Sequence, residues 1–167
     1  MPPGGSNLII LDEDFKRINA SLARLNQEAR GKAVFLIDKN GQLISCQGET
    51  AGLDTTSLAS LTAGNIAATG GLAQILGEKE FSVLFHEGER DHLHISIVAQ
   101  RVILVVIFDE RSSLGLVRLR VRRATAELEK IFEEIAQKVE REKESLVEVE
   151  SPFAEITDED IDRLFSE

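Results

Sequence analysis

The sequence predicts an α/β domain of the α+β type, in which helices flank a five-stranded antiparallel sheet. Three segments carry apolar residues at helical spacing, and five shorter runs are apolar and rich in β-branched residues. Short turns join the first two of the five runs to each other, and short turns also join the last three. Turns this short connect antiparallel neighbours. The expected order is therefore α-β-β-α-β-β-β-α, followed by a C-terminal tail.

The composition limits the classes of protein to which the chain can belong. With 167 residues, of which 43% are hydrophobic and 29% charged, it can build one globular domain with a tail. A net charge of -10 argues against nucleic acid as a partner and favours a protein. No secretory signal or bilayer-spanning apolar run is found, and a single cysteine cannot form an internal disulfide. We therefore expect a cytoplasmic protein without a membrane span.

A helix is expected near the N-terminus, after a flexible start at residues 1–10. The acidic residues 12–14 suit its first turn, and Gly31 is its expected end. Its apolar stripe is formed by Phe15, Ile18, Leu22 and Leu25. This spacing predicts a helix with one buried face.

The runs expected as strands are 33–38, 43–46, 81–87, 92–99 and 102–109. The Lys-Asn-Gly sequence between the first two runs is a hairpin signal. The last run is apolar throughout, so we expect it at the centre of the sheet, whereas the alternating run before it should bury mainly one face.

The chain is organised around a helix expected at 54–76, with candidate N-caps at 54–57 and a stop at Gly77. Its large apolar face, expected to fill the core against the sheet, consists of Leu58, Leu61, Ala68, Leu72 and Ile75. Its other face, over which another backbone could approach closely, consists of Ser60, Ala63, Gly64, Ala67, Gly70 and Gly71. Each helical glycine costs about 1 kcal/mol relative to alanine, so this row indicates crowded packing, either within the domain or at a subunit interface.

A long helix is expected from Leu114, with Ser112 or Ser113 as its cap. Residues 117–123 also alternate like a strand, so the pattern leaves two interpretations of where the helix starts. Its apolar register fades beyond Glu144, so we expect the domain to span 11–144 and a linker with a partner-binding segment to span 145–167. The apolar residues of this tail are Phe153, Ile156, Ile161, Leu164 and Phe165. Such a segment either packs back on its own domain or docks on another protein.

No residue pattern predicts an active site, and we expect no cofactor or metal of the chain's own. His92 and His94 could begin a metal site, but packed or surface histidines are commoner. Cys46 lies in an apolar strand, which favours an unreactive buried thiol. Arg101 and Arg111 lie in or after turns, where each is either solvated or supplied in trans as an arginine finger.

The chain also resembles a known family over nearly its whole length. Four segments resemble the roadblock family of dynein-light-chain-like proteins: DTTSLASLTAGN (54–65), FLIDKNGQLI (35–44), FHEG (85–88) and VVIFD (105–109). Two more are similar to the MglB-type branch of that family: SSLGLVRLR (112–120) and SPFAEITDEDIDRLF (151–165). Generic roadblock domains lack such a tail.

The resemblance implies a roadblock fold and a homodimer joined through the central helices and neighbouring strands. It implies an MglA-like small Ras-like GTPase as the partner, with two copies of the chain on each GTPase. The chain would activate GTP hydrolysis by ordering the GTPase's own arginine and glutamine, while GTP and Mg²⁺ belong to the GTPase. The row Ser60, Ala63, Gly64, Ala67 and Gly71 would form the platform, and the tail would favour nucleotide exchange.

The cellular role implied by the resemblance is bacterial cell polarity or gliding motility. The resemblance is compatible with clustering of the protein at a cell pole and does not require it. An interpretation from another class is a non-catalytic homodimeric scaffold or adaptor that localises a small GTPase or another protein. A small-molecule sensor is a third interpretation, but no convergent polar set that would line a pocket is visible in the sequence.

Overall fold

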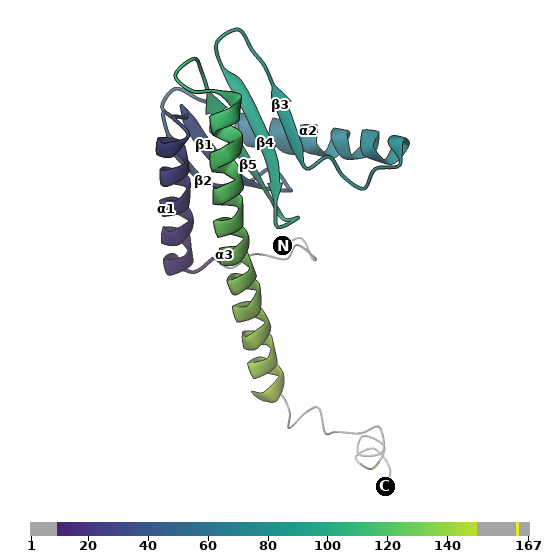
Figure 1. Cartoon of the computed structure of the whole chain (residues 1–167). Helices are drawn as coiled ribbons and strands as arrows, with labels where there is room; N and C mark the ends of the chain where they lie inside the picture. Colours follow the sequence, from purple (N-terminus) through teal and green to yellow (C-terminus); the bar gives the residue numbers. More distant parts are fainter. Residues whose placement is uncertain (1–9, 150–162, 164–167) are drawn as a thin grey trace. The chain divides into compact units, whose positions relative to one another are not determined.

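The computed structural model of the protein describes residues 10–149 and 163. Its elements are α1 (Asp12–Glu28), β1 (Ala33–Asp38), β2 (Leu43–Gly48), α2 (Thr55–Leu76), β3 (Val83–His86), β4 (His92–Val98), β5 (Val102–Phe108) and α3 (Leu114–Val149), as Figure 1 shows. The predicted order of elements and the five-stranded antiparallel sheet are confirmed.

The chain divides into a compact unit from Leu11 to Phe132, which contains the whole sheet, and a second unit that includes α3 from Glu133 onward. Helix α3 runs to Val149, past Glu144, where the sequence predicts the domain to end. The division into 11–144 and 145–167 stays a prediction.

The strands lie in the spatial order β2-β1-β5-β4-β3, and every neighbouring pair is antiparallel. Strand β5 occupies the centre and is buried along its whole length, as its continuous apolar run predicts. Its Val105 lies opposite Phe35 of β1 on one side and Ile95 of β4 on the other. The side chains on both faces of β5 are therefore buried in the core.

Strand β4 is buried on both faces, so the expectation that it buries mainly one face is wrong. Ile95 is buried in the core on the α2 side, whereas His94 and Ser96 are buried on the side of α3. The alternation in the sequence shows only which residues are polar and which are apolar, and it does not show which are buried. A helix that covers the polar side buries those residues as well.

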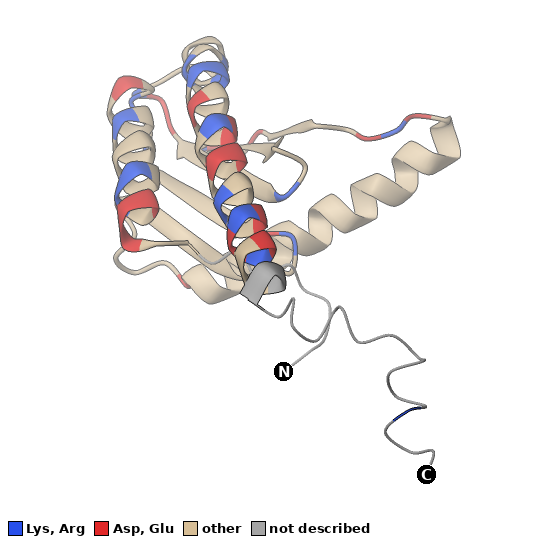
Figure 2. Cartoon of the chain, turned by 90° about the horizontal axis from the view of Figure 1, so that it is seen from below, with Lys and Arg blue, Asp and Glu red and all other residues tan. Residues whose placement is uncertain are grey.

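Helix α1 and the part of α3 up to Phe132 cover one face of the sheet, and α2 lies on the other (Figures 1 and 2). Polar contacts join α1 and α3. Glu127 of α3 accepts a hydrogen bond from the Ser21 hydroxyl of α1 at 3.1 Å, and it pairs with Arg24 of α1 at 2.9 Å. Arg120 and Glu28 form a second ion pair at 3.6 Å. These contacts hold α3 beside α1 and over the sheet.

The stripe predicted on α1 is buried at Ile18, Leu22 and Leu25. The predicted stop at Gly31 is wrong, because the helix ends at Glu28 and the residue with a left-handed backbone is Arg30, with φ of 51°. A Cβ atom added at Gly31 would lie 2.6 Å from the Asn26 side-chain oxygen, a contact that a small movement of the Asn26 side chain relieves.

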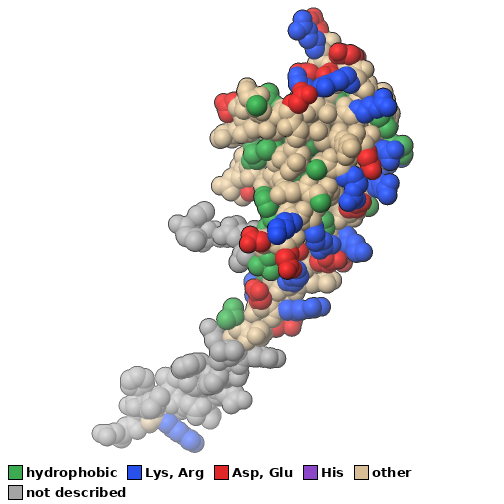
Figure 3. Space-filling model, turned by 90° about the vertical axis from the view of Figure 1, so that its left-hand side faces the viewer, with side chains coloured by type: hydrophobic (Ala, Val, Ile, Leu, Met, Phe, Trp, Pro, Cys, Tyr) green, Lys and Arg blue, Asp and Glu red, His purple; other side chains and the backbone are tan. Residues whose placement is uncertain are grey.

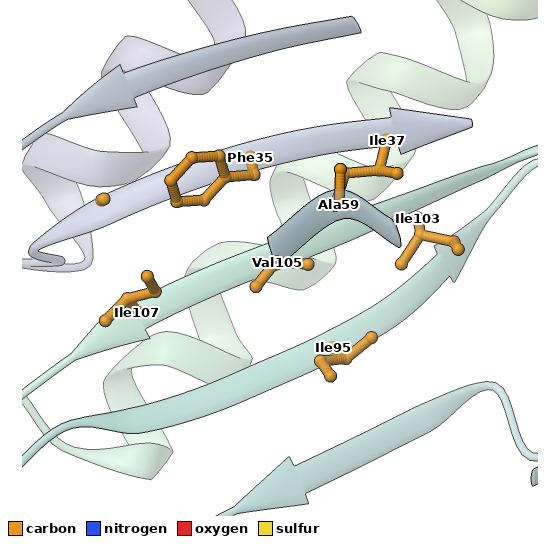
Figure 4. Packing of buried hydrophobic residues seen from close by; sticks show 8 residues of the cluster. Phe35, Ile37, Ala59, Ile95, Ile103, Val105 and Ile107 are labelled. Carbon is orange, nitrogen blue, oxygen red and sulfur yellow. The ribbon is translucent and has the colours of Figure 1, made fainter. Parts of the chain in front are cut away.

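The core on the α2 face is built by large side chains of the strands and one small residue of the helix (Figure 4). Ala59 of α2 lies over the strands among Phe35, Ile37 and Ile103, and only 1% of its surface is exposed. Because alanine has so short a side chain, the helix backbone approaches the sheet closely.

Helix α2 begins and ends as the sequence predicts. The Asp54 carboxylate accepts a hydrogen bond from the Ser57 backbone N–H at 3.1 Å, which makes Asp54 the N-cap. At the other end Gly77 has a left-handed backbone with φ of 76°, a conformation that glycine adopts without strain. The Leu116 backbone N–H likewise donates to the Ser113 hydroxyl at 3.2 Å, which supports Ser113 as the cap of α3.

Candidate interaction surface on helix α2

Helix α2 contains no charged residue in its 22 positions. Figure 2 shows the contrast with α1 and α3, whose surfaces carry many Lys, Arg, Asp and Glu side chains. On the face drawn in Figure 3, charged side chains gather along one flank, and the opposite flank is largely free of them. An apolar helix surface without charged residues favours contact with another molecule over contact with water.

The expectation that the large apolar face of α2 fills the core is wrong. Leu61, Leu72 and Ile75 are 74%, 58% and 82% exposed, Ala68 is also exposed, and only Leu58 packs partly against the core. The inward face of the first half of the helix is formed instead by Ala59, Thr62, Ala63 and Ile66. The helix therefore packs on the sheet through a face of mixed side-chain size, which is not the face with the most large apolar residues.

The predicted row of small residues is divided between the two faces. Ala63 is partly buried on the core, whereas Ser60, Gly64, Ala67 and Gly71 are exposed. Half-buried Gly70 lies between the two faces.

One end of the small row is packed by the chain itself. A Cβ atom added at Gly41, in the β1–β2 turn, would lie 3.2 Å from Ser60 Cα and 3.4 Å from Ala63 Cβ. The close backbone approach expected over this row is therefore made there by the chain's own hairpin.

The other end of the row is open. Cβ atoms added at Gly64 or Gly71 would meet nothing within 4 Å. Since each glycine lowers helix stability by about 1 kcal/mol relative to alanine, contacts within this chain give no reason to keep them. The space over both glycines is open to close approach by another polypeptide.

We define the α2 strip as the exposed apolar face of this helix. It consists of Leu61, Gly64, Ala67, Ala68, Gly71, Leu72 and Ile75. Sequence reasoning assigned the large members of the strip to the core. The absence of charge along the whole helix was the signal that could have placed them outside.

Two arginines proposed as candidates for action in trans differ in their surroundings. Arg111 pairs with Asp109 at 3.0 Å and with Glu49 at 3.4 Å, so its guanidinium is held by its own chain. Hydrogen bonds from Arg111 lower the pKa of Asp109, and these two carboxylates raise the pKa of the arginine. Arg101 is exposed in the β4–β5 turn and has no ion pair within residues 10–149 and 163.

The histidines are engaged in packing and hydrogen bonding. The His92 ring lies against Phe85 and Phe108, with centroid distances of 6.1 and 5.2 Å, and accepts a hydrogen bond from the Gly88 backbone N–H. His86 contacts the Asn65 amide at 3.0 Å. Within the described residues, no three His, Cys, Asp or Glu side chains form a group that could hold a metal ion.

Cys46 is only partly buried against the core, whereas the sequence predicts a buried thiol. Among the helices that the structure describes, none combines the length and hydropathy needed to cross a bilayer. The predicted tail residues, which lie outside the described residues, are Phe153, Ile156, Ile161, Leu164 and Phe165.

Comparison with known proteins identifies the family of this fold. The Roadblock/LC7 domain matches residues 18–108. Among solved structures, Myxococcus xanthus MglB is 60% identical, with a TM-score of 0.73 over 76% of this chain and 96% of that protein. The gliding protein MglB of Thermus thermophilus is 32% identical, with a TM-score of 0.72 over 78% of this chain and 99% of that protein.

A structure described as MglB with tetrameric arrangement is also 32% identical, with a TM-score of 0.73 over 79% of this chain and 99% of that protein. No curated protein sequence gives a match. Since the domain match spans more than half of the chain and the 60% identity to MglB extends over 96% of the chain in that solved structure, this chain belongs to the Roadblock/LC7 family, as a member of its MglB type.

Proposed function

We propose that this chain is a GTPase-activating regulator of an MglA-like small Ras-like GTPase in bacterial cell polarity or motility. The 60% identity to Myxococcus xanthus MglB supports the choice of partner. The observation that carries the proposal is the uncharged α2 strip, exposed in the isolated chain. Burial of apolar surface contributes roughly 25 cal/mol per Å², so covering this strip would favour binding of another polypeptide.

The regulator would act by differential affinity rather than by chemistry of its own. Binding most tightly the GTPase conformation whose switch loops are ordered for hydrolysis would shift the GTPase population toward it. The GTPase's own arginine and glutamine would then stay in productive positions, with GTP and Mg²⁺ bound by the GTPase. The pairing of Arg111 with its own Asp109 and Glu49 fits this mechanism, since that guanidinium is engaged within the chain.

The acting form would be a homodimer, with two copies of the chain on one GTPase. Within the described residues, strand β3 has a strand neighbour on its β4 side alone, so its outer edge offers unpaired backbone groups. Strand addition across this edge, together with contact between α2 helices, would join two sheets into one. The tetrameric arrangement of one similar protein is consistent with self-association.

The test is phosphate release from a purified MglA-like GTPase, with and without the full chain. We expect acceleration by the wild type and its loss in Ala67→Arg, because Ala67 is exposed in the strip and an arginine there would block close approach. Ala63 is a poorer target, since it packs near the chain's own hairpin turn. Ala126→Arg, an exposed position on α3, is the matched control and should keep the activity.

A non-catalytic scaffold is the second candidate, because an apolar strip also serves binding without any effect on turnover. Complex formation on a sizing column with an unchanged rate of phosphate release would favour the scaffold. Equal loss of acceleration in Ala67→Arg and Ala126→Arg would remove the α2 strip from the proposed mechanism.

A further inference from the structure

The opposite face of the sheet from the α2 strip carries a hollow with a volume of about 560 Å³. Its floor is formed by strand β4 with the nearby Ser82 and Val83, and its wall by helix α3 between Arg118 and Glu129. Small-molecule sites have volumes of roughly 300–1,000 Å³, so the hollow has the size of a ligand site. All of its lining residues belong to the Leu11–Phe132 unit.

Two buried polar side chains on the floor lack partners. His94 and Ser96 are 2% and 5% exposed, and neither the His94 Nδ1 atom nor the Ser96 hydroxyl has a hydrogen bond within the described residues. Both residues line the hollow. Since nearly all buried polar atoms in folded proteins are hydrogen-bonded, these two atoms indicate a partner that enters the hollow.

The histidine is suited to a neutral hydrogen-bonding role. Burial, and secondarily the positive charge of Arg118, lower the pKa of His94 below its ordinary value of 6.5. At neutral pH the ring is therefore uncharged, and Nδ1 is either a donor or an acceptor, according to the tautomer. The Ser96 hydroxyl is equally versatile, so the floor can adapt to a polar ligand atom.

The wall presents an excess of positive charge. Arg118 and Arg122 are one helical turn apart, and neither forms an ion pair within the part of the chain that the structure describes. Arg120, on the same helix, is by contrast paired with Glu28. Glu129 is the single carboxylate of the lining and lies nearly two turns beyond Arg122.

We propose that this hollow binds a small organic anion, with a carboxylate or phosphate group held by Arg118 and Arg122. A polar atom of the ligand bonds His94 and Ser96, and a short apolar body contacts Val83 and Val121. Guanidinium groups match both kinds of anion by paired hydrogen bonds. The side chains that converge here come from distant parts of the chain, which is why the polar set could not be found in the sequence.

The test follows the His94 ring by NMR in the full-length protein while hexanoate, hexyl phosphate or inorganic phosphate is added. The His94 signals are assigned by elimination with His86→Gln and His92→Gln. We expect saturable shifts with hexanoate or hexyl phosphate, and the two probes distinguish a carboxylate ligand from a phosphate ligand. A shift with inorganic phosphate alone would contradict the need for an apolar body.

The matched variants separate a built site from general attraction of anions. Replacing both arginines, Arg118→Gln with Arg122→Gln, should raise the dissociation constant by about tenfold or more, since charge-assisted hydrogen bonds are lost. Arg123→Gln removes the same kind of charge from an exposed position outside the hollow and should leave it unchanged. Equal weakening by both changes, or the absence of any saturable shift, would overturn the proposal.

Discussion

Burial of His94 makes the free energy of unfolding depend on pH. Its folded-state pKa is lowered, mainly by burial and then by the charge of Arg118, so the folded chain resists taking up a proton there. Between pH 6.5 and that lower pKa, the unfolded chain binds a proton that the folded chain does not. The free energy of unfolding should therefore fall as the pH drops through this window.

We predict that His94→Gln flattens this dependence, because the replacement has no titratable group. Urea unfolding of the wild type and of His94→Gln at about pH 7.5 and about pH 5.5 measures it. Asp54 and Asp109 do not interfere, since hydrogen bonds lower their pKa values below 3.8 and their stabilising effect is lost only at still lower pH. An equal slope in His94→Gln and wild type would show that another group titrates in this window.

At the scale of the element, α2 combines poor helix formers with an apolar outer face. Gly64 and Gly71 are exposed, and an added Cβ would meet nothing within 4 Å. We predict that Gly71→Ala stabilises the isolated chain by about 1 kcal/mol, which raises the thermal midpoint by roughly 3 °C at dilutions where the chain is monomeric. Calorimetry of the wild type and of Gly71→Ala measures this change in the thermal midpoint.

The same change should weaken association through α2, because the added methyl group stands where a second polypeptide packs closely. Sizing chromatography with an MglA-like GTPase measures this second effect. The matched control is Gly115→Ala in α3, another glycine at which an added Cβ would meet nothing within 4 Å. Unchanged association in Gly71→Ala would leave the retention of this glycine unexplained.

At the scale of the whole molecule, the proposed regulator divides its tasks between the folded unit and the tail. We predict that deletion of residues 151–167 leaves the sheet and its helices intact, because the described core cluster of the Leu11–Phe132 unit is built from residues of that unit itself. Nucleotide release from the GTPase should change more than phosphate release. Measuring both rates with the deleted and full-length chains checks this, and loss of soluble protein on deletion would show that the tail is structural.

Local signals in the sequence determined most of the architecture. Turn chemistry and apolar periodicity predict each helix and strand, an N-cap of α2 within 54–57, the stop at Gly77 and the central place of β5. These features depend on neighbours within a few residues, so the sequence alone is enough to predict them. The family resemblance rests on the same kind of local pattern.

Only the tertiary structure decided which side of each element is covered. Leu61, Leu72 and Ile75 face outward because another face of α2 packs on the strands and the second half of the helix runs beyond the sheet (Figure 1). His94 and Ser96 are buried because α3, distant in sequence, lies over β4. Packing depends on the complementary volumes of elements that meet only in the folded chain, and periodicity within one element does not contain that information.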